Sequence, residues 1–309
     1  MRTFGKLSLA ALALGAVGCG GGPGSKALAE MDDAALTSEA EIANFANGSA
    51  LRVYFVALST QGLIEEVEGN CPAVKVDGNT TTYEGGCTNA DGVKFTGRAV
   101  RKLDAPGSTT GSVTYEKFGT EELGSCESGS TYTQKSLVDG TSRLGGTATT
   151  GTFELDLVIE QTGVADEGSC VARTERLAYD YKGEVDGPLP DPNNEASLLR
   201  VSTWNGRGRM GMTGLGVVNV ETKDEVLNLR VCETEAISGT TTFTAGKNEA
   251  VITYDGAAQC TITSAATWTL NGVSQGSIAG IGCSALGTGA MSAWGLLALG
   301  GLMLRRRRN

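Results

Sequence analysis

The sequence predicts a β-rich fold: an antiparallel meander or sandwich-like β domain with one or two short N-terminal helices and disulfides. Apolar and polar residues alternate along several segments, turn dipeptides such as Asn271-Gly272 separate them, and cysteines recur between residues 71 and 260. Alternation places successive side chains on opposite faces of a strand, and Asn-Gly supplies the positive φ angles of a tight hairpin turn. A chain of this length can bury a sizeable core, in one β domain or two.

Residues 1–18 have the features of a secretory signal peptide, because basic residues precede an apolar region that is too short for a stable membrane span. This region ends in Ala16-Val17-Gly18-Cys19, which resembles a bacterial lipoprotein signal. The resemblance implies that the thiol of Cys19 receives diacylglycerol. A competing A-x-A site for ordinary signal peptidase lies at residues 27–29.

Residues 19–37 are predicted to be a flexible tether, since the run from Gly20 to Ser25 is rich in glycine. Residues 38–70 are expected to form one or two helices that pack on the main domain. Ser38 and Glu41 have the spacing of a capping box, and apolar residues then recur at roughly helical spacing.

From Cys71 onward, the pattern changes to the two-residue period of strands. The alternation is clearest in residues 153–159, 177–181 and 227–231. Three prolines interrupt the pattern at residues 188–194. We therefore expect a loop or domain boundary there, between β units at 71–187 and 195–280.

Cysteines of an exported chain usually pair, so the even number in the β region predicts three disulfides. The sequence around Cys87 is echoed before Cys260, and the residues before Cys126 are echoed before Cys170. These echoes favour nearest-neighbour pairing among the fifteen possible connectivities. The predicted pairs are Cys71–Cys87, Cys126–Cys170 and Cys232–Cys260. A metal site is not expected here, because the chain has no C-x-x-C pair and no histidine.

Residues 281–309 have the features of a sorting signal. An uncharged apolar stretch at residues 285–304 could form a helix about 30 Å long, which matches the hydrocarbon core of a bilayer. The arginines that follow would stay cytoplasmic, so the rest of the chain would lie outside. They are Arg305, Arg306, Arg307 and Arg308. A permanent single-span anchor is one interpretation.

The same residues resemble the myxobacterial C-terminal sorting tag MYXO-CTERM, through Gly282, Cys283 and Ser284, the apolar span and the arginine cluster. In that family an intramembrane protease, myxosortase, removes the span close to the cysteine. The resemblance implies lipid on Cys283, an outer-membrane or cell-surface location, and signal peptidase and a myxosortase-like protease as processing partners. It implies location and not activity.

The region between the two signals is strongly acidic. Residues 20–282 contain all 35 acidic residues and 19 of the 25 basic ones, which leaves a net charge of −16. This charge disfavours nucleic acid and anionic membrane surfaces as partners. Membrane contact is therefore expected through lipid or the C-terminal span.

Two motifs that can mark chemistry are better explained as strands. Residues 206–211 match G-x-G-x-x-G, but a dinucleotide site needs a helix next, and glycine and β-branched residues follow. Residues 272–276 match G-x-S-x-G, but a serine nucleophile needs a base, which is nearly always histidine. We therefore expect no cofactor.

Acidic residues offer two weaker candidates. Glu154, Asp156 and Glu160 could pair as glycosidase carboxylates about 5–10 Å apart, but an alternating strand would leave them facing water. A turn-rich loop could supply oxygen ligands to a Ca²⁺ ion, through Asp186, Asp191, Asn193, Asn194 and Glu195. Turn-rich loops of this composition usually bind no metal ion. We therefore assign no catalytic residue and no metal ligand.

The sequence favours a non-enzymatic surface protein with a structural, adhesive or binding role and an unknown ligand. One alternative is a carboxylate-based extracellular hydrolase, which would gather acids in an aromatic-lined cleft. Another is an envelope lipid-binding β protein with a concave apolar face. A flat sheet with scattered charges would favour the first interpretation.

Overall fold

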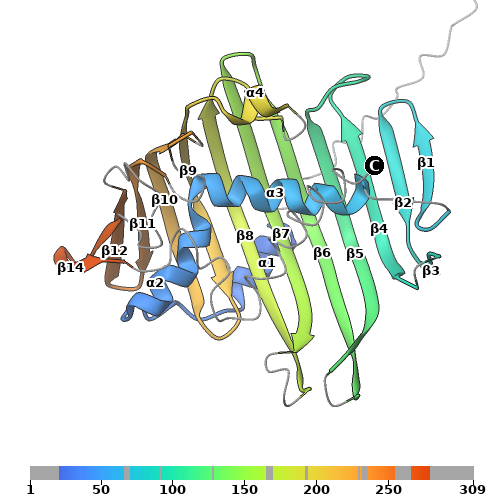
Figure 1. The fold of residues 1–309 in the computed structure, drawn as a ribbon, viewed down its shortest axis with the longest axis horizontal. Coiled ribbons are helices and arrows are strands. Elements are labelled where there is room, and N and C mark those ends of the chain that lie inside the picture. Colours follow the sequence, from blue (N-terminus) through green and yellow to red (C-terminus); the bar gives the residue numbers. More distant parts are fainter. Residues whose placement is uncertain are drawn as a thin grey trace, which may run out of the picture.

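The chain folds around one large antiparallel sheet, which is the β-rich meander that the sequence predicts (Figure 1). Neighbouring strands in the sheet are, with one exception, consecutive in the chain. The computed structural model describes residues 21–65, 70–90, 92–126, 129–164, 170–191, 194–228, 230–231, 236–254 and 266–278.

The first part of the sheet contains its longest strands. In chain order they are β1 (Ala73–Asp77), β2 (Thr80–Glu84), β3 (Cys87–Thr88), β4 (Lys94–Leu103), β5 (Gly111–Ser125), β6 (Thr131–Gly146), β7 (Thr150–Val164) and β8 (Ala172–Asp186). The exception is β4, which pairs with β2 toward its end and with the short β3 at its start.

The second part of the sheet continues from the first without a break. Its strands are β9 (Ser202–Met212), β10 (Gly216–Leu227), β11 (Ser238–Ala245), β12 (Asn248–Tyr254), β13 (Thr267–Leu270) and β14 (Val273–Ser277). The predicted boundary at residues 188–194 and the short α4 (Glu195–Leu198) lie in the connection between β8 and β9. These two strands pair directly, from Leu177 with Met212 to Val185 with Trp204, so segments 71–187 and 195–280 both contribute strands to one sheet.

The predicted helices before the sheet are confirmed. They are α2 (Glu39–Phe45), the 3₁₀ turn η1 (Ala46–Gly48) and α3 (Ala50–Glu65). The amide of Glu41 donates to the Ser38 hydroxyl (3.3 Å), and the amide of Ser38 donates to the Glu41 carboxylate (3.0 Å), which completes the expected capping box. Helix α3 crosses one face of the sheet, over β6 to β10 (Figure 1).

The core lies between α3 and the sheet. The ring of Tyr54 in α3 lies 5.0 Å from that of Trp204 and 5.8 Å from that of Phe153, measured between centroids. Phe153 and the residues that follow it at every second position of β7, Leu155 and Leu157, are fully buried. Burial of each such side chain contributes about 1.5–3 kcal/mol, so this face holds α3 on the sheet.

The prediction of a flexible tether is wrong for residues 21–37. Within this segment, α1 (Pro23–Ala29) packs on the sheet face opposite α3, where Leu28 is buried against Val158 and Val217. A glycine-rich composition indicates flexibility only when nothing packs against the backbone. Here Gly24 allows close approach, because a Cβ at this position would overlap the carbonyl oxygen of Tyr179.

After α1 the chain passes from one face of the sheet to the other. Asp33 forms an isolated parallel bridge with Val217, and the amide of Ala34 donates to the Val217 carbonyl (2.9 Å). Leu36 then joins the core on the α3 side, where it is fully buried. Residues 21–65 therefore contact both faces of the sheet.

Two of the three predicted disulfides are confirmed. Cys71–Cys87 joins the residues just before β1 to β3, with 5.8 Å between Cα atoms, and Cys126–Cys170 joins the turn regions of the β5–β6 and β7–β8 hairpins (5.9 Å). The remaining predictions lie outside the described residues. They are Cys232–Cys260, the signal at residues 1–18 with Cys19, the span at 285–304, and Gly282, Cys283, Ser284 and Arg305 to Arg308.

Within the described ranges, no helix combines the length and the apolar character that crossing a membrane requires.

Candidate functional site

The G-x-G-x-x-G match at residues 206–211 lies inside β9, and a turn leads directly into β10. No helix follows this match, as the sequence predicts. The glycines have a packing role instead, because a Cβ at Gly206 would overlap the ring of Tyr181 on the neighbouring strand. The G-x-S-x-G match at residues 272–276 begins in the Asn271-Gly272 turn and continues into β14, an exposed edge strand of the sheet.

The three acids of β7 lie on the face of the sheet opposite α3, and each has its own partner. The Glu154 carboxylate pairs with Lys182 (2.7 Å), and that of Glu160 lies 4.0 Å from Arg176. Asp156 instead accepts hydrogen bonds from the first residues of α1, including the amide of Ser25 (3.0 Å). The structure therefore does not gather these carboxylates around one cleft.

The acidic loop after β8 uses its described side chains to order the chain. The Asp186 carboxylate accepts a hydrogen bond from the amide of Thr203 (2.7 Å), and the Asn194 side chain accepts one from the amide of Ser197 (3.3 Å). Asn193 and the side chain of Glu195 lie outside the described residues. No cluster of three acidic or cysteine side chains that could hold a metal ion occurs within the described ranges.

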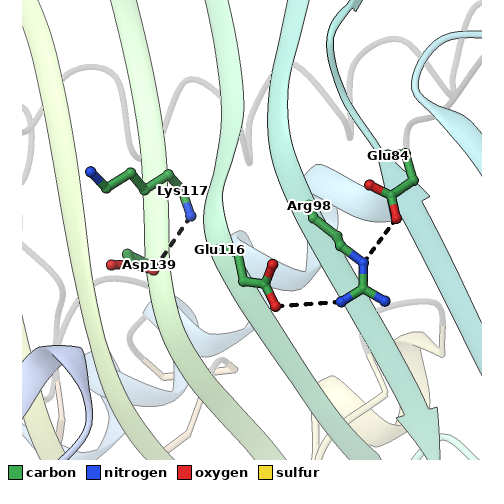
Figure 2. Close-up of polar contacts among 5 residues, drawn as sticks. All are labelled: Glu84, Arg98, Glu116, Lys117 and Asp139. Atoms are coloured by element: carbon green, nitrogen blue, oxygen red, sulfur yellow. Dashed lines mark hydrogen bonds and ion pairs between the residues drawn. The ribbon is translucent and has the colours of Figure 1, made fainter.

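The widest candidate surface is the sheet face opposite α3, which we call the polar face. Alternation directs one side chain in two toward it, and cross-strand ion pairs run along it. Figure 2 shows one example, in which the Arg98 guanidinium on β4 contacts Glu84 on β2 (2.8 Å) and Glu116 on β5 (3.4 Å). Exposed pairs of this kind contribute only about 0–1 kcal/mol each, so their main effect is to fix a charge pattern.

A shallow depression of about 720 Å³ lies on the polar face over β8 to β12. Two rows of side chains cross the depression. Within each row, successive residues are register partners on neighbouring strands. One row contains Asp180, Arg209, Asn219, Thr244 and Glu249. The other contains Lys182, Arg207, Glu221 and Thr242. Five strands span about 19 Å, which is long enough for an extended ligand.

Most charges of the depression are already paired. Arg209 contacts Asp180 (2.9 Å), and Glu221 contacts Lys223 (3.0 Å) on the same strand. In contrast, the exposed Arg207 guanidinium has no ion pair with any described residue, although it lies between Lys182 and Glu221 in the register. Its donors therefore remain available to a ligand, and five N–H groups in a planar fork suit carboxylate or vicinal hydroxyl oxygens.

A second polar cluster is buried beneath the first turn of α3. The carboxylate of Glu225, only 2% exposed, accepts a hydrogen bond from the amide of Leu51 (3.1 Å). The hydroxyl of Thr222 accepts one from the amide of Ala50 (3.1 Å). These side chains satisfy amides at the start of the helix, which otherwise have no partner within it. The cluster is therefore a tertiary helix cap.

A β-bulge in β10 makes this cap possible. The register with β9 shifts between Thr222 and Glu225, and Asp224 within the bulge has a φ of 50°. The extra residue moves the alternation by one position, so that Thr222 and Glu225 both face α3. Burial raises the pKa of Glu225, while the hydrogen bonds from Leu51 and Ser49 and the charge of Arg52 oppose this shift.

Neither Arg207 nor Glu225 is among the site residues that the sequence predicts. The available signal for Arg207 was its position between two glycines in an alternating strand, which leaves its side chain on the polar face. No sequence signal locates a bulge that turns Glu225 inward. Comparisons with protein-family models, curated proteins and solved structures found no match.

Proposed function

We propose that this chain is an exported, surface-anchored protein that binds an extended external ligand on its polar face and performs no catalysis. Anchoring would use lipid on Cys19 or Cys283, or the C-terminal span. The observation that carries the proposal is the depression over β8 to β12, which presents charged, amide and hydroxyl groups in register across five strands.

The arrangement of groups supports binding over turnover. A carboxylate pair that cleaves glycosides needs one acid with a raised pKa and a second held across a cleft. On the polar face, Asp180 and Glu154 are instead engaged by Arg209 and Lys182. The described acid whose pKa burial raises, Glu225, is occupied with the amide of Leu51 on the other side of the sheet.

The lipid-binding alternative has less support. It requires an open apolar surface, whereas the apolar face of this sheet is covered by α3, whose Tyr54 is buried against Phe153 and Trp204 of the sheet. None of the described residues that line the depression is aromatic, so recognition would depend on hydrogen bonds and charge. This chemistry suits a polar polymer such as a polysaccharide or a peptide.

The proposal can be tested by retention of the purified protein on immobilised polymers. The probes are a neutral polysaccharide, an acidic polysaccharide, peptidoglycan and a denatured polypeptide. We expect retention on one class, weakened by about tenfold in Arg207→Glu, because this change removes five donors and adds a like charge beside Glu221.

The matched control is Lys102→Glu, which makes the same change of charge on β4, far from the depression on the same face. An equal loss of retention in both variants would show that only the net charge matters, which would contradict the proposed site. Absence of retention on every probe would also contradict it. Release of soluble fragments from any polymer would replace binding by the hydrolase alternative.

A further inference from the structure

The sheet ends in two exposed edge strands, β1 and β14, which differ in regularity. Every residue of both strands is exposed. The register of β14 with β13 shifts between Trp268 and Thr269, and Gly276 has a φ of 88°. The register of β1 with β2 is unbroken from Ala73 to Asp77. Bulges protect an edge from pairing with another chain, so β1 is the edge that remains open to pairing.

Strand β1 also has the side chains of a docking edge. On the α3 side of the sheet, Val76 is 69% exposed and Val74 is 47% exposed. Its start follows the Cys71–Cys87 disulfide, and its end enters a tight turn into β2. The strand is thus held in an extended form, which lowers the entropic cost of adding a further strand.

We propose that β1 pairs with β1 of a second copy of this chain, antiparallel about a two-fold axis with Val76 opposite Val76 of the partner copy. In this register, Lys75 lies opposite Asp77 of the other copy, and the symmetry forms this ion pair twice. A cross-strand pair of opposite charges stabilises a sheet, and the facing valines cover their exposed surface. The two sheets become one continuous sheet.

Charge selects this register over its neighbour. Moving the axis by one residue places Lys75 opposite Lys75 of the other copy, and like charges directly opposite are destabilising. A lysine in an edge strand commonly prevents pairing with another chain. Here Asp77 lies on the same face two residues away, so the lysine has a partner in the two-fold register.

The pairing involves few residues, so we expect a weak dimer in solution that strengthens where copies share a surface. Small interfaces are typical of transient complexes, and anchoring on one membrane raises the effective concentration. The latter step rests on the proposed surface location, whereas the pairing itself does not.

A charge-reversal cycle tests the proposal on protein extracted from its cells in mild detergent. Lys75→Glu and Asp77→Lys should each weaken dimerisation by about tenfold, because each converts two attractive pairs into two repulsive ones. The double variant Lys75→Glu/Asp77→Lys should restore it. Sedimentation from about 1 μM to about 1 mM covers the expected range of affinity. Lys247→Glu is the control, since it makes the same change of net charge as Lys75→Glu but lies in the exposed turn between β11 and β12, many strands away from β1.

A cross-link tests the register directly. Val76→Cys should form a disulfide-linked dimer under mild oxidation beyond the level of the unsubstituted chain. Val74→Cys should not, because its side chain would lie opposite Gly78 of the other copy, about 13 Å from its own equivalent. The proposal would be overturned if the chain stayed monomeric at every concentration, or if neither charge reversal weakened the dimer. It would also be overturned if the double variant did not recover dimerisation, or if both cysteine variants cross-linked equally.

Discussion

The carboxylate of Glu225 in β10 accepts a hydrogen bond from the amide of Leu51 in the first turn of α3 (3.1 Å), although 174 residues separate them in the chain. This contact orients α3 across the sheet, because the neighbouring amide of Ala50 is held in the same way by Thr222. The hydroxyl of Thr222 also lies 3.3 Å from that of Thr241 in β11, so the cap continues into the sheet.

The first prediction concerns the pH dependence of this cap. Burial raises the pKa of Glu225 above its ordinary value of 4.5, so the folded state binds this proton more tightly than the unfolded state. The contribution of the protonated Glu225 side chain to stability is complete below pH 4.5, and it is lost as the pH rises toward the folded-state pKa. The free energy of unfolding of the wild type should therefore fall, relative to that of Glu225→Gln, as the pH rises above 4.5.

Denaturant titrations between pH 4 and pH 8 measure this difference, with Thr222→Val as the matched control. That variant removes the partner of the Ala50 amide without removing a titrating group, so it should lower stability by about 1–3 kcal/mol at every pH. A difference between wild type and Glu225→Gln that does not change with pH would contradict the prediction.

The sequence predicts the parts of this fold that depend on local pattern. Ser38 and Glu41 form the expected capping box, and Asn271 and Gly272 have the positive φ angles (50° and 76°) of the expected turn. In both cases the residues involved are within three positions of each other. Short-range physics is therefore enough to predict them.

Other turn signals were wrong because glycine has more than one use in a sheet. Asp139-Gly140 and Asn205-Gly206 have the same type of turn signal as Asn271-Gly272, but they lie within β6 and β9. Gly140 has a φ of 123° beside the bulge of β5, and Gly206 makes room for Tyr181. The role of a glycine depends on the neighbouring strand, and a local sequence pattern carries no information about that strand.

The second prediction compares two glycines in helices. In Gly24→Ala, the added Cβ would overlap backbone atoms of Tyr179 and Leu157, so α1 must move away from the sheet. Overpacking of this kind costs about 1–3 kcal/mol. In Gly62→Ala, the Cβ in α3 meets no atom within 4 Å, so the variant should gain about 0.5–1 kcal/mol from the better helix propensity.

Thermal unfolding measures both changes, and hydrogen exchange locates them. Amides of α1 should exchange faster in Gly24→Ala and remain protected in Gly62→Ala. If Gly24→Ala left the exchange of α1 unchanged, the close packing of α1 on the sheet would be wrong, and the flexible tether would return as the better description.

The third prediction concerns the disulfides. Chain-entropy arguments give about 3 kcal/mol for the Cys71–Cys87 loop, with a separation of 16 residues, and about 4 kcal/mol for Cys126–Cys170, with a separation of 44. In urea titrations, the free energy of unfolding should therefore fall more when both Cys126 and Cys170 are changed to Ser than when both Cys71 and Cys87 are. Cys232–Cys260 should appear as a third bridge in non-reducing peptide mapping. A free thiol at Cys232 or a crossed pair would contradict the inference from the sequence echoes.

The last prediction concerns the C-terminal signal, which lies outside the described residues. Gly282-Cys283-Ser284 ahead of an apolar span and four arginines predicts removal of the span and lipid on Cys283. Intact-mass analysis of protein from the cell envelope should therefore show a chain that ends near Cys283 and carries lipid at this cysteine. Cys283→Ser should remain unprocessed, whereas Ser277→Ala lies in β14 outside the tag, keeps the cysteine and serves as the control. Full-length protein that still carries Arg305 to Arg308 would contradict processing and favour a permanent single-span anchor.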